Sequence, residues 1–160
     1  MKQHKVVVKL KTAMIESDYD IFNELGQKMG TVRQDNTLYK KKVIKDLEGN
    51  EIGWSVQASD GPFDTDWAYD LIYKGKTIGR LKEKGHLFHK EYFLRPQGLH
   101  LIGDFMSADL RVMWGNRQVM QVWHTSEMYE NSIYCRVKCV VYEHPDDFPL
   151  ALLIAVTLCN

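Results

Sequence analysis

The sequence predicts a mainly β protein, built as a meander of hairpins in one antiparallel sheet and followed by an apolar C-terminal segment. Three observations lead to this prediction. A five-residue shape (Gly, two polar residues, one apolar residue, Gly) occurs three times, as GQKMG, GNEIG and GKTIG. Short β-rich runs lie on both sides of each copy. From Phe148 to Cys159, every residue except Thr157 is apolar or proline.

Each glycine shape is expected to be one hairpin. Apolar or aromatic runs precede the copies (YDIF, KVI, YDLIY) and follow them (TVRQ, WSVQ, RLKE), with a polar turn between. The first glycine of a copy should supply the positive φ of a tight turn. The second follows the first inward apolar residue and should mark a bulge, a bend or a close backbone approach. The first glycines are Gly26, Gly49 and Gly75, and the second are Gly30, Gly53 and Gly79.

A fourth, looser copy of the hairpin is VMWGNRQVMQVW, with Met120 where the second glycine would be. About twelve strands can be drawn along the chain, which is more than an open twisted sheet holds comfortably. Because strand edges must be removed or protected, we expect the sheet to close into a barrel or to split into a sandwich.

Two strands near the chain ends show alternation with period two. In KVVVKLK, Val6, Val8 and Leu10 alternate with lysines. In SIYCRVKCVVYE, Cys135, Val137 and Cys139 share one parity, which indicates a half-buried strand with both cysteines in the core. The two cysteines would lie about 13 Å apart, beyond disulfide reach, whereas Cys159 can approach either from the tail.

The apolar tail favours a buried helix of about twelve residues. Asp146 and Asp147 are candidate N-caps, and Pro149 suits the first turn. Such a helix would be about 18 Å long, short of the roughly 30 Å hydrocarbon core of a bilayer. A final buried strand is the alternative, because the segment contains β-branched residues.

The bulk composition indicates one domain over residues 1–160. Lys and Arg together number 21, as do Asp and Glu, so no nucleic-acid partner is expected. The three cysteines have no CxxC spacing and indicate free thiols in a reducing, cytoplasmic setting. The start of the chain is not expected to be a signal peptide, and no transmembrane span is expected.

The candidate binding residues are Arg80, Lys82 and Lys84, which would share one face of a strand. Three cations along about 13 Å can grip a phosphorylated headgroup. The alternative is a solvated outer face on which Glu83 and other acids balance the lysines. A second basic run, YKKKVIK, precedes these residues in the chain.

No catalytic, metal or cofactor site is expected. His86 and His89 would point to opposite faces of a strand, and DLEGNE lacks the calcium-loop spacing. The sequence has no GxGxxG, P-loop or GxSxG motif. The four tryptophans favour core packing over a membrane interface or a ligand wall. They are Trp54, Trp67, Trp114 and Trp123.

The glycine hairpins and the apolar tail together resemble the LURP-one-related family, in the tubby C-terminal-like group that includes phospholipid scramblases. The matching pieces cover nearly the whole chain after about Lys5: YDIFNELGQKMGTV, KVIKDLEGNEIGWSV, YDLIYKGKTIGRLKEK, LHLIGDFMSADLRVMWGNRQVMQVWH and FPLALLIAVTLCN. The resemblance implies a closed barrel of roughly twelve antiparallel strands that encloses a hydrophobic C-terminal helix.

The resemblance also guides the expected function. Tubby domains bind phosphoinositides through basic strand residues, although those residues cannot be aligned to particular positions here. We therefore expect a non-enzymatic binding or regulatory module for anionic phospholipid headgroups, located in the cytoplasm and peripherally at a membrane. A protein-interaction or scaffold role is the alternative, and an enzyme or a lipid scramblase is the least supported.

Overall fold

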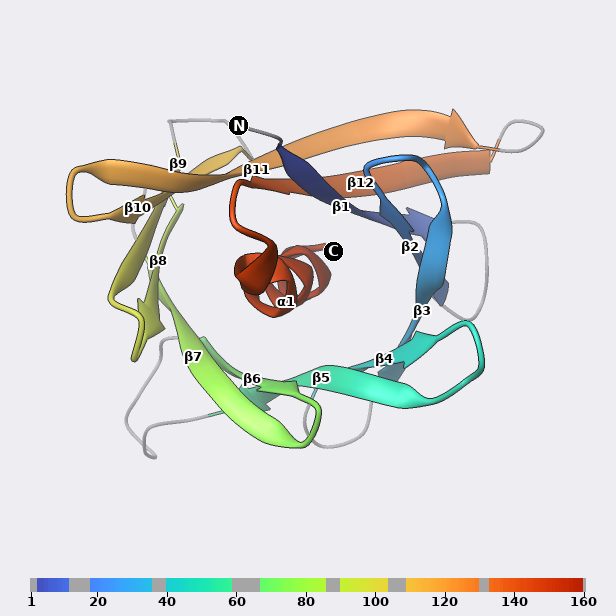
Figure 1. Cartoon of the computed structure of the whole chain (residues 1–160), viewed down its shortest axis with the longest axis horizontal. Helices are drawn as coiled ribbons and strands as arrows, with labels where there is room; N and C mark the ends of the chain where they lie inside the picture. Colours follow the sequence, from blue (N-terminus) through green and yellow to red (C-terminus); the bar gives the residue numbers. More distant parts are fainter. Residues whose placement is uncertain are drawn as a thin grey trace.

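The chain forms a closed barrel of twelve antiparallel strands around a single helix (Figure 1). The computed structural model describes residues 3–11, 18–35, 40–58, 67–85, 90–103, 109–129 and 133–159. Each strand pairs with its neighbours in sequence, and β1 closes the barrel by pairing with β12. The barrel prediction is therefore confirmed over the sandwich, and closure removes the free sheet edges.

The strands follow one another in a simple meander. They are β1 (His4–Lys11), β2 (Asp18–Asn23), β3 (Lys28–Asp35), β4 (Lys41–Asp46), β5 (Glu51–Ala58), β6 (Ala68–Tyr73), β7 (Lys76–Gly85), β8 (Lys90–Arg95), β9 (Leu99–Gly103), β10 (Leu110–Trp114), β11 (Arg117–Tyr129) and β12 (Ile133–Tyr142).

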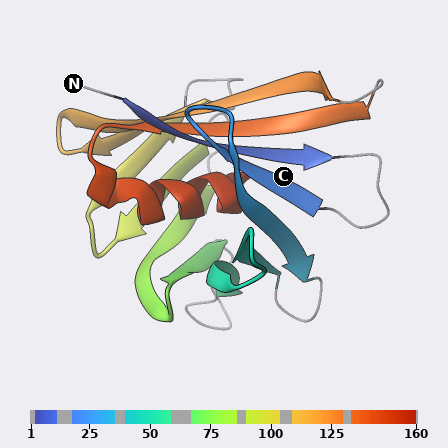
Figure 2. The same ribbon diagram turned by 45° about the vertical axis from the view of Figure 1, so that its right-hand side comes forward.

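The apolar tail is a helix that runs through the barrel (Figures 1 and 2). A short 3₁₀ turn, η1 (Pro145–Asp147), leads into α1 (Phe148–Leu158), and all residues from 150 to 158 are buried. The helix prediction is confirmed and the strand alternative is wrong. Asp147 occupies the N-cap and Pro149 lies in the first turn, as predicted, although the Asp147 side chain makes no capping hydrogen bond.

The helix is apolar on every side because the barrel wall surrounds it. A helix without a polar face must be buried, and a wide closed barrel leaves a lumen that strand side chains alone do not fill. The inward residues Val6 and Val8 on β1 belong to the same core cluster as Leu153 of α1. Helix and wall therefore bury each other in one continuous core.

Each glycine shape is a hairpin with a bulge, as predicted. The first glycines all have positive φ, including 75° at Gly26 and 86° at Gly49. The strand register shifts where Ile21 pairs with Gly30 and Phe22 pairs with Lys28, which leaves Met29 as the extra residue. The same shift recurs in the other three hairpins. The extra residues all pack against the core, and they are Met29, Ile52, Ile78 and Val119.

The second glycines allow close approach between strands. A Cβ added to Gly30 would overlap the backbone carbonyl oxygen of Lys45 on β4. A Cβ added to Gly53 would lie 2.7 Å from the carbonyl oxygen of Ile72. A side chain at either position would push neighbouring strands apart, so the repeat encodes the curvature of the wall.

The parity of β12 differs from the one that its cysteines suggest. Val140 pairs with Val6, and Lys138 pairs with Val8, so the inward side of β12 carries Lys138, Val140 and Tyr142. Cys139 therefore lies on the outer side and is only half-buried, against the core position expected from the sequence. The fully buried cysteines are Cys135 and Cys159, and all three thiols are free.

The tryptophans are also not core residues. Trp67 and Trp123 are each 46% exposed, Trp114 is 60% exposed, and Trp54 is half-buried. Core packing is wrong for these residues because α1 already occupies the lumen. Within the described part of the chain, no helix has the length and apolarity needed to cross a bilayer.

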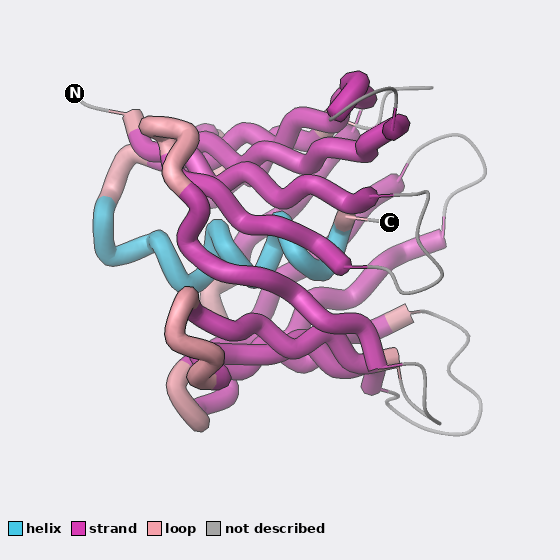
Figure 3. Tube along the Cα trace, turned by 90° about the vertical axis from the view of Figure 1, so that its right-hand side faces the viewer, coloured by secondary structure: helices cyan, strands magenta, loops and turns pink. Residues whose placement is uncertain are grey.

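The two ends of the barrel differ (Figure 3). The short turns between β2 and β3 and between β4 and β5 lie at the end where α1 begins, which we call the entry end. The helix finishes towards the opposite end, which we call the far end.

Candidate functional site

Arg80, Lys82 and Lys84 share the outer face of β7, as predicted. Leu81 lies between them in sequence, is fully buried and points to the lumen. Arg80 and Lys82 are half-buried on the wall, and Lys84 is exposed. The period of two along the strand places all three cations on one side.

Arg80 is engaged by a carboxylate of the wall. Its Nε lies 2.7 Å from Oδ1 of Asp70, and its Nη2 lies 3.2 Å from Oδ2 of the same carboxylate. Asp70 stands directly opposite on β6. A two-pronged Arg–carboxylate pair is a strong, oriented contact, so this guanidinium is largely committed to the wall.

Lys84 lies beside an aromatic stack. Its Nζ is 5.0 Å from the centre of the Phe93 ring, and Phe93 stacks on His100 with ring centres 4.4 Å apart. A ring nitrogen of His100 contacts the carboxylate of Glu91. Cation–π contacts leave an ammonium accessible to solvent and ligand, so Lys84 remains available for a phosphate.

The outer side of β6–β10 carries more positive than negative charge. We call these outward positions the basic face. Among the residues of these strands whose side chains the structure describes, the outward charged groups are five cations, Arg80, Lys82, Lys84, Arg95 and Arg111, and two carboxylates, Asp70 and Glu91. Arg95 pairs with Arg80 across the strands, a neighbour that the sequence alone did not reveal.

Glu83 does not balance the basic face, contrary to the alternative offered from the sequence. It shares the inward parity of Leu81 and pairs with the buried Tyr92. Burial, and then the charge of Glu83, raise the pKa of Tyr69 and the pKa of Tyr92. The acid therefore acts inside the wall, while the lysines face outward.

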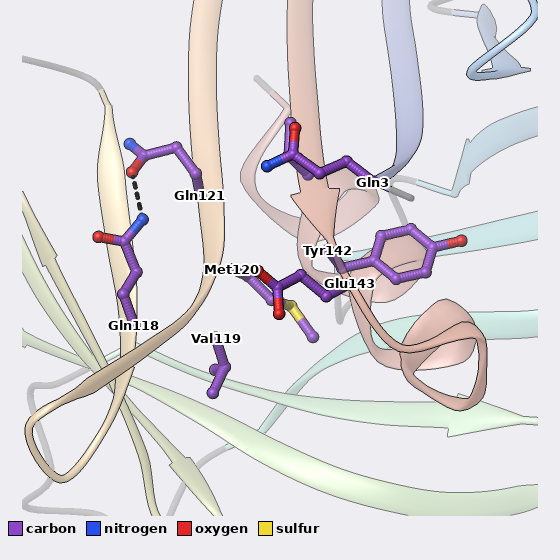
Figure 4. Close-up of a pocket in the computed structure, with 8 residues that line it drawn as sticks. Gln3, Gln118, Val119, Met120, Gln121, Tyr142 and Glu143 are labelled. Atoms are coloured by element: carbon purple, nitrogen blue, oxygen red, sulfur yellow. Dashed lines mark hydrogen bonds between the residues drawn. The ribbon is translucent and has the colours of Figure 1, made fainter. Parts of the chain in front are cut away.

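Two hollows lie around β11 and β12. The smaller, about 70 Å³, is bordered by Gln3, Met120, Tyr142 and Glu143 (Figure 4). The amides of Gln118 and Gln121 bond each other beside it, at 2.8 Å. A larger, shallow groove of about 520 Å³ runs past Trp123 and Cys139. Their linings are mostly neutral, so neither gives a clear ligand chemistry.

A buried lysine caps the helix inside the barrel. Lys42 points inward from β4 and is only 8% exposed. Its Nζ donates to the carbonyl oxygens of Val156 at 3.1 Å, Thr157 at 3.3 Å and Cys159 at 2.9 Å. The last carbonyls of a helix lack intrahelical partners and carry partial negative charge. The Lys42 ammonium gives these carbonyls hydrogen-bond donors and places a positive charge beside their partial negative charge.

Burial is the main cause that lowers the pKa of Lys42 to about 8; repulsion from Lys40 and Lys138 acts in the same direction, and Cys159 acts against it. The three carbonyls favour the charged form and oppose this shift. Lys138 is itself inward-facing on β12 and 6% exposed. Burial also raises the pKa of Cys159 to about 11, which keeps this thiol protonated at neutral pH.

A cavity of about 230 Å³ lies beside this cap. Its lining combines two ammonium groups, three hydroxyls and one amide, from Gln34, Lys40, Lys42, Ser55, Tyr69 and Thr157. The Thr157 hydroxyl donates to the Leu153 carbonyl at 2.6 Å and lies 2.9 Å from the Ser55 hydroxyl. Tyr19 donates to the Gln34 amide oxygen at 2.9 Å. Hydrogen bonds therefore hold Gln34, Ser55 and Thr157 in place beside the cavity.

The interior position of Lys42 was not predicted from the sequence. Lys42 belongs to the basic run YKKKVIK, but it shares its parity with Ile44, which is fully buried. That parity was the available signal. It was ambiguous because Val43, on the opposite parity, is also apolar.

No cluster of three or more histidines, cysteines or acids suited to a metal occurs in the described ranges. His86 and His89 lie outside the described residues.

The chain was compared with protein-family models, with curated proteins and with solved structures, and none of them matches it. The family resemblance noted in the sequence stays a prediction.

Proposed function

We propose that the chain is a non-enzymatic binding module whose basic face docks on anionic phospholipid headgroups. One observation carries the proposal: among the described side chains on the outer side of β6–β10, five cations stand against two carboxylates, in a chain whose net charge is zero. Such an asymmetry concentrates positive potential on one side of a neutral molecule.

The expected attraction is modest and sensitive to salt. A basic residue near an anionic leaflet contributes about 1 kcal/mol, so the net excess of three cations, five minus two, gives roughly 3 kcal/mol. Lys84 should contribute most, because it is exposed, whereas Arg80 is held by Asp70. The predicted resemblance to tubby-like domains, which bind phosphoinositides, supports the same ligand class.

The test is co-sedimentation of the full chain with vesicles of neutral phospholipid, with and without a phosphoinositide, at low and high salt. We expect binding that requires the phosphoinositide and falls steeply as salt rises. The double variant Lys82→Ala, Lys84→Ala should lose most of it.

The matched control removes two outward cations from another part of the wall, Arg33 on β3 and Lys45 on β4. The variant Arg33→Ala, Lys45→Ala has the same net charge as the test variant and should keep its binding. Equal losses in both variants, or no salt-sensitive binding by the native chain, would rule out the basic face as the docking surface.

A further inference from the structure

The polar cavity inside the barrel wall differs in position and chemistry from the basic face. It lies next to the C-terminal residues of α1, with lining residues from β3, β4, β5 and β6. We infer that it is a second binding site, for a small phosphate-bearing anion held by Lys40, Lys42 and Tyr69. The inference does not depend on the proposed lipid docking, because the two sites lie on opposite sides of the wall.

The interior charge around the cavity favours an anion. Lys42 and Lys138 are both more than nine-tenths buried, and Lys40, the residue before β4, lines the same cavity while remaining exposed. Lys40 and Lys138 both repel the charge of Lys42, and an anion bound beside these groups reduces that repulsion. Glu83, the inward carboxylate of β7, acts on Tyr69 and Tyr92 and does not line the cavity.

The lining groups divide between charge and hydrogen bonding. Lys42 directs its ammonium protons to three helix carbonyls, so it offers the cavity mainly its charge. Lys40 and Tyr69 bring an ammonium and a phenol that can donate to phosphate oxygens. The Ser55 and Thr157 hydroxyls stand beside them. Phosphate, with up to two charges and several acceptor oxygens, fits this combination of groups.

The size of the cavity limits the ligand. At about 230 Å³ it is smaller than the roughly 300–1,000 Å³ of sites for drug-sized molecules. Inorganic phosphate or the phosphate monoester of a compact molecule matches it. The same phosphate chemistry can come from a soluble metabolite or from a lipid headgroup, and the experiment must separate these sources.

The test is titration calorimetry of the full chain with inorganic phosphate, with glycerol 3-phosphate and, as the uncharged match, with glycerol, at constant ionic strength. We expect saturable binding of the two phosphates and none of glycerol. Lys40→Ala and Tyr69→Phe should each weaken the binding by about tenfold. Both changes spare the Lys42 cap, so the variants should fold.

Lys45→Ala is the control, because Lys45 lies on β4 but faces away from the lumen. It should bind phosphate like the native chain, and so should Lys82→Ala, Lys84→Ala, whatever that variant does on vesicles. If neither phosphate binds, or if Lys40→Ala and Tyr69→Phe bind as well as the native chain, the inference is wrong.

A vesicle arm identifies the source of the phosphate. If phosphoinositide vesicles displace glycerol 3-phosphate from the native chain, and Lys40→Ala weakens its binding to them, the site takes a lipid headgroup. If vesicles leave glycerol 3-phosphate bound, the site takes a soluble phosphate. Either result supports the cavity as a phosphate site.

Discussion

Lysines on the inner and the outer side of the barrel wall differ in burial and in the groups that they contact. Lys42 on β4 faces the lumen, is 8% exposed and caps the helix through three carbonyl oxygens. Lys82 on β7 faces outward, in a row with two other cations. Strand parity alone separates a lysine that points into the lumen and caps the helix from one that points out of the barrel.

The largest effect on stability should come from removing α1, the helix that packs against the inner side of the wall. Truncation after Phe148 deletes nearly all of α1, whose residues from 150 to 158 are buried in the core. Without the helix, the lumen exposes its apolar lining, so we expect the truncated chain not to fold. Circular dichroism with thermal melting checks this, and a soluble β protein that melts cooperatively would contradict it.

A smaller effect on the free energy of unfolding should distinguish the inward-facing Lys42 from the outward-facing Lys82. Lys42→Met keeps the apolar stem but leaves three buried carbonyls without their donor, at a cost on the order of 3 kcal/mol. Lys82→Met should change the free energy of unfolding by less than about 0.5 kcal/mol. Urea unfolding at pH 7 measures both, and equal losses would show that the cap does not stabilise the helix.

The smallest effect should be a rise in stability between pH 8 and pH 9. Lys42 has a pKa of about 8 in the folded chain against an ordinary 10.5, so the unfolded chain holds its proton longer and stability increases with pH. Over this interval the gain is up to about 1 kcal/mol. Above about pH 9, Cys159, with its raised pKa of about 11, works in the opposite direction.

Urea unfolding in steps across this pH range checks the prediction, with Lys42→Met as the control that should show no rise. If the stability of the native chain is flat or falls from pH 8 to pH 9, burial does not lower the pKa of Lys42 to about 8, and the prediction is wrong.

The glycine repeats made most of the wall predictable from the sequence. Gly26 and Gly49 had to take positive φ at turns, and Gly30 and Gly53 had to admit a neighbouring backbone. These are local requirements that few other residues satisfy. The outer row of Arg80, Lys82 and Lys84 was predictable for the same reason, since alternation along a strand needs no knowledge of its neighbours.

The interior polar cavity was not predictable in this way. It combines Lys42, Ser55 and Thr157, and hydrogen bonds join residues that are 102 and 115 positions apart in the chain. The inward face of β12 was mispredicted because both faces carry apolar residues, among them Cys139 outside and Val140 inside. The positions of the tryptophans were mispredicted because hydrophobicity alone does not tell whether a lumen is already filled.

The sequence by itself determined the hairpins, their bulges and the buried helix, because each depends on the stereochemistry or periodicity of a short segment. The tertiary structure decided which strand faces point inward, how Arg80 is neutralised by Asp70, and where Lys42 meets the end of α1. These outcomes depend on the register between strands and on the position of the helix in the lumen. Both are set by the closure of the whole barrel.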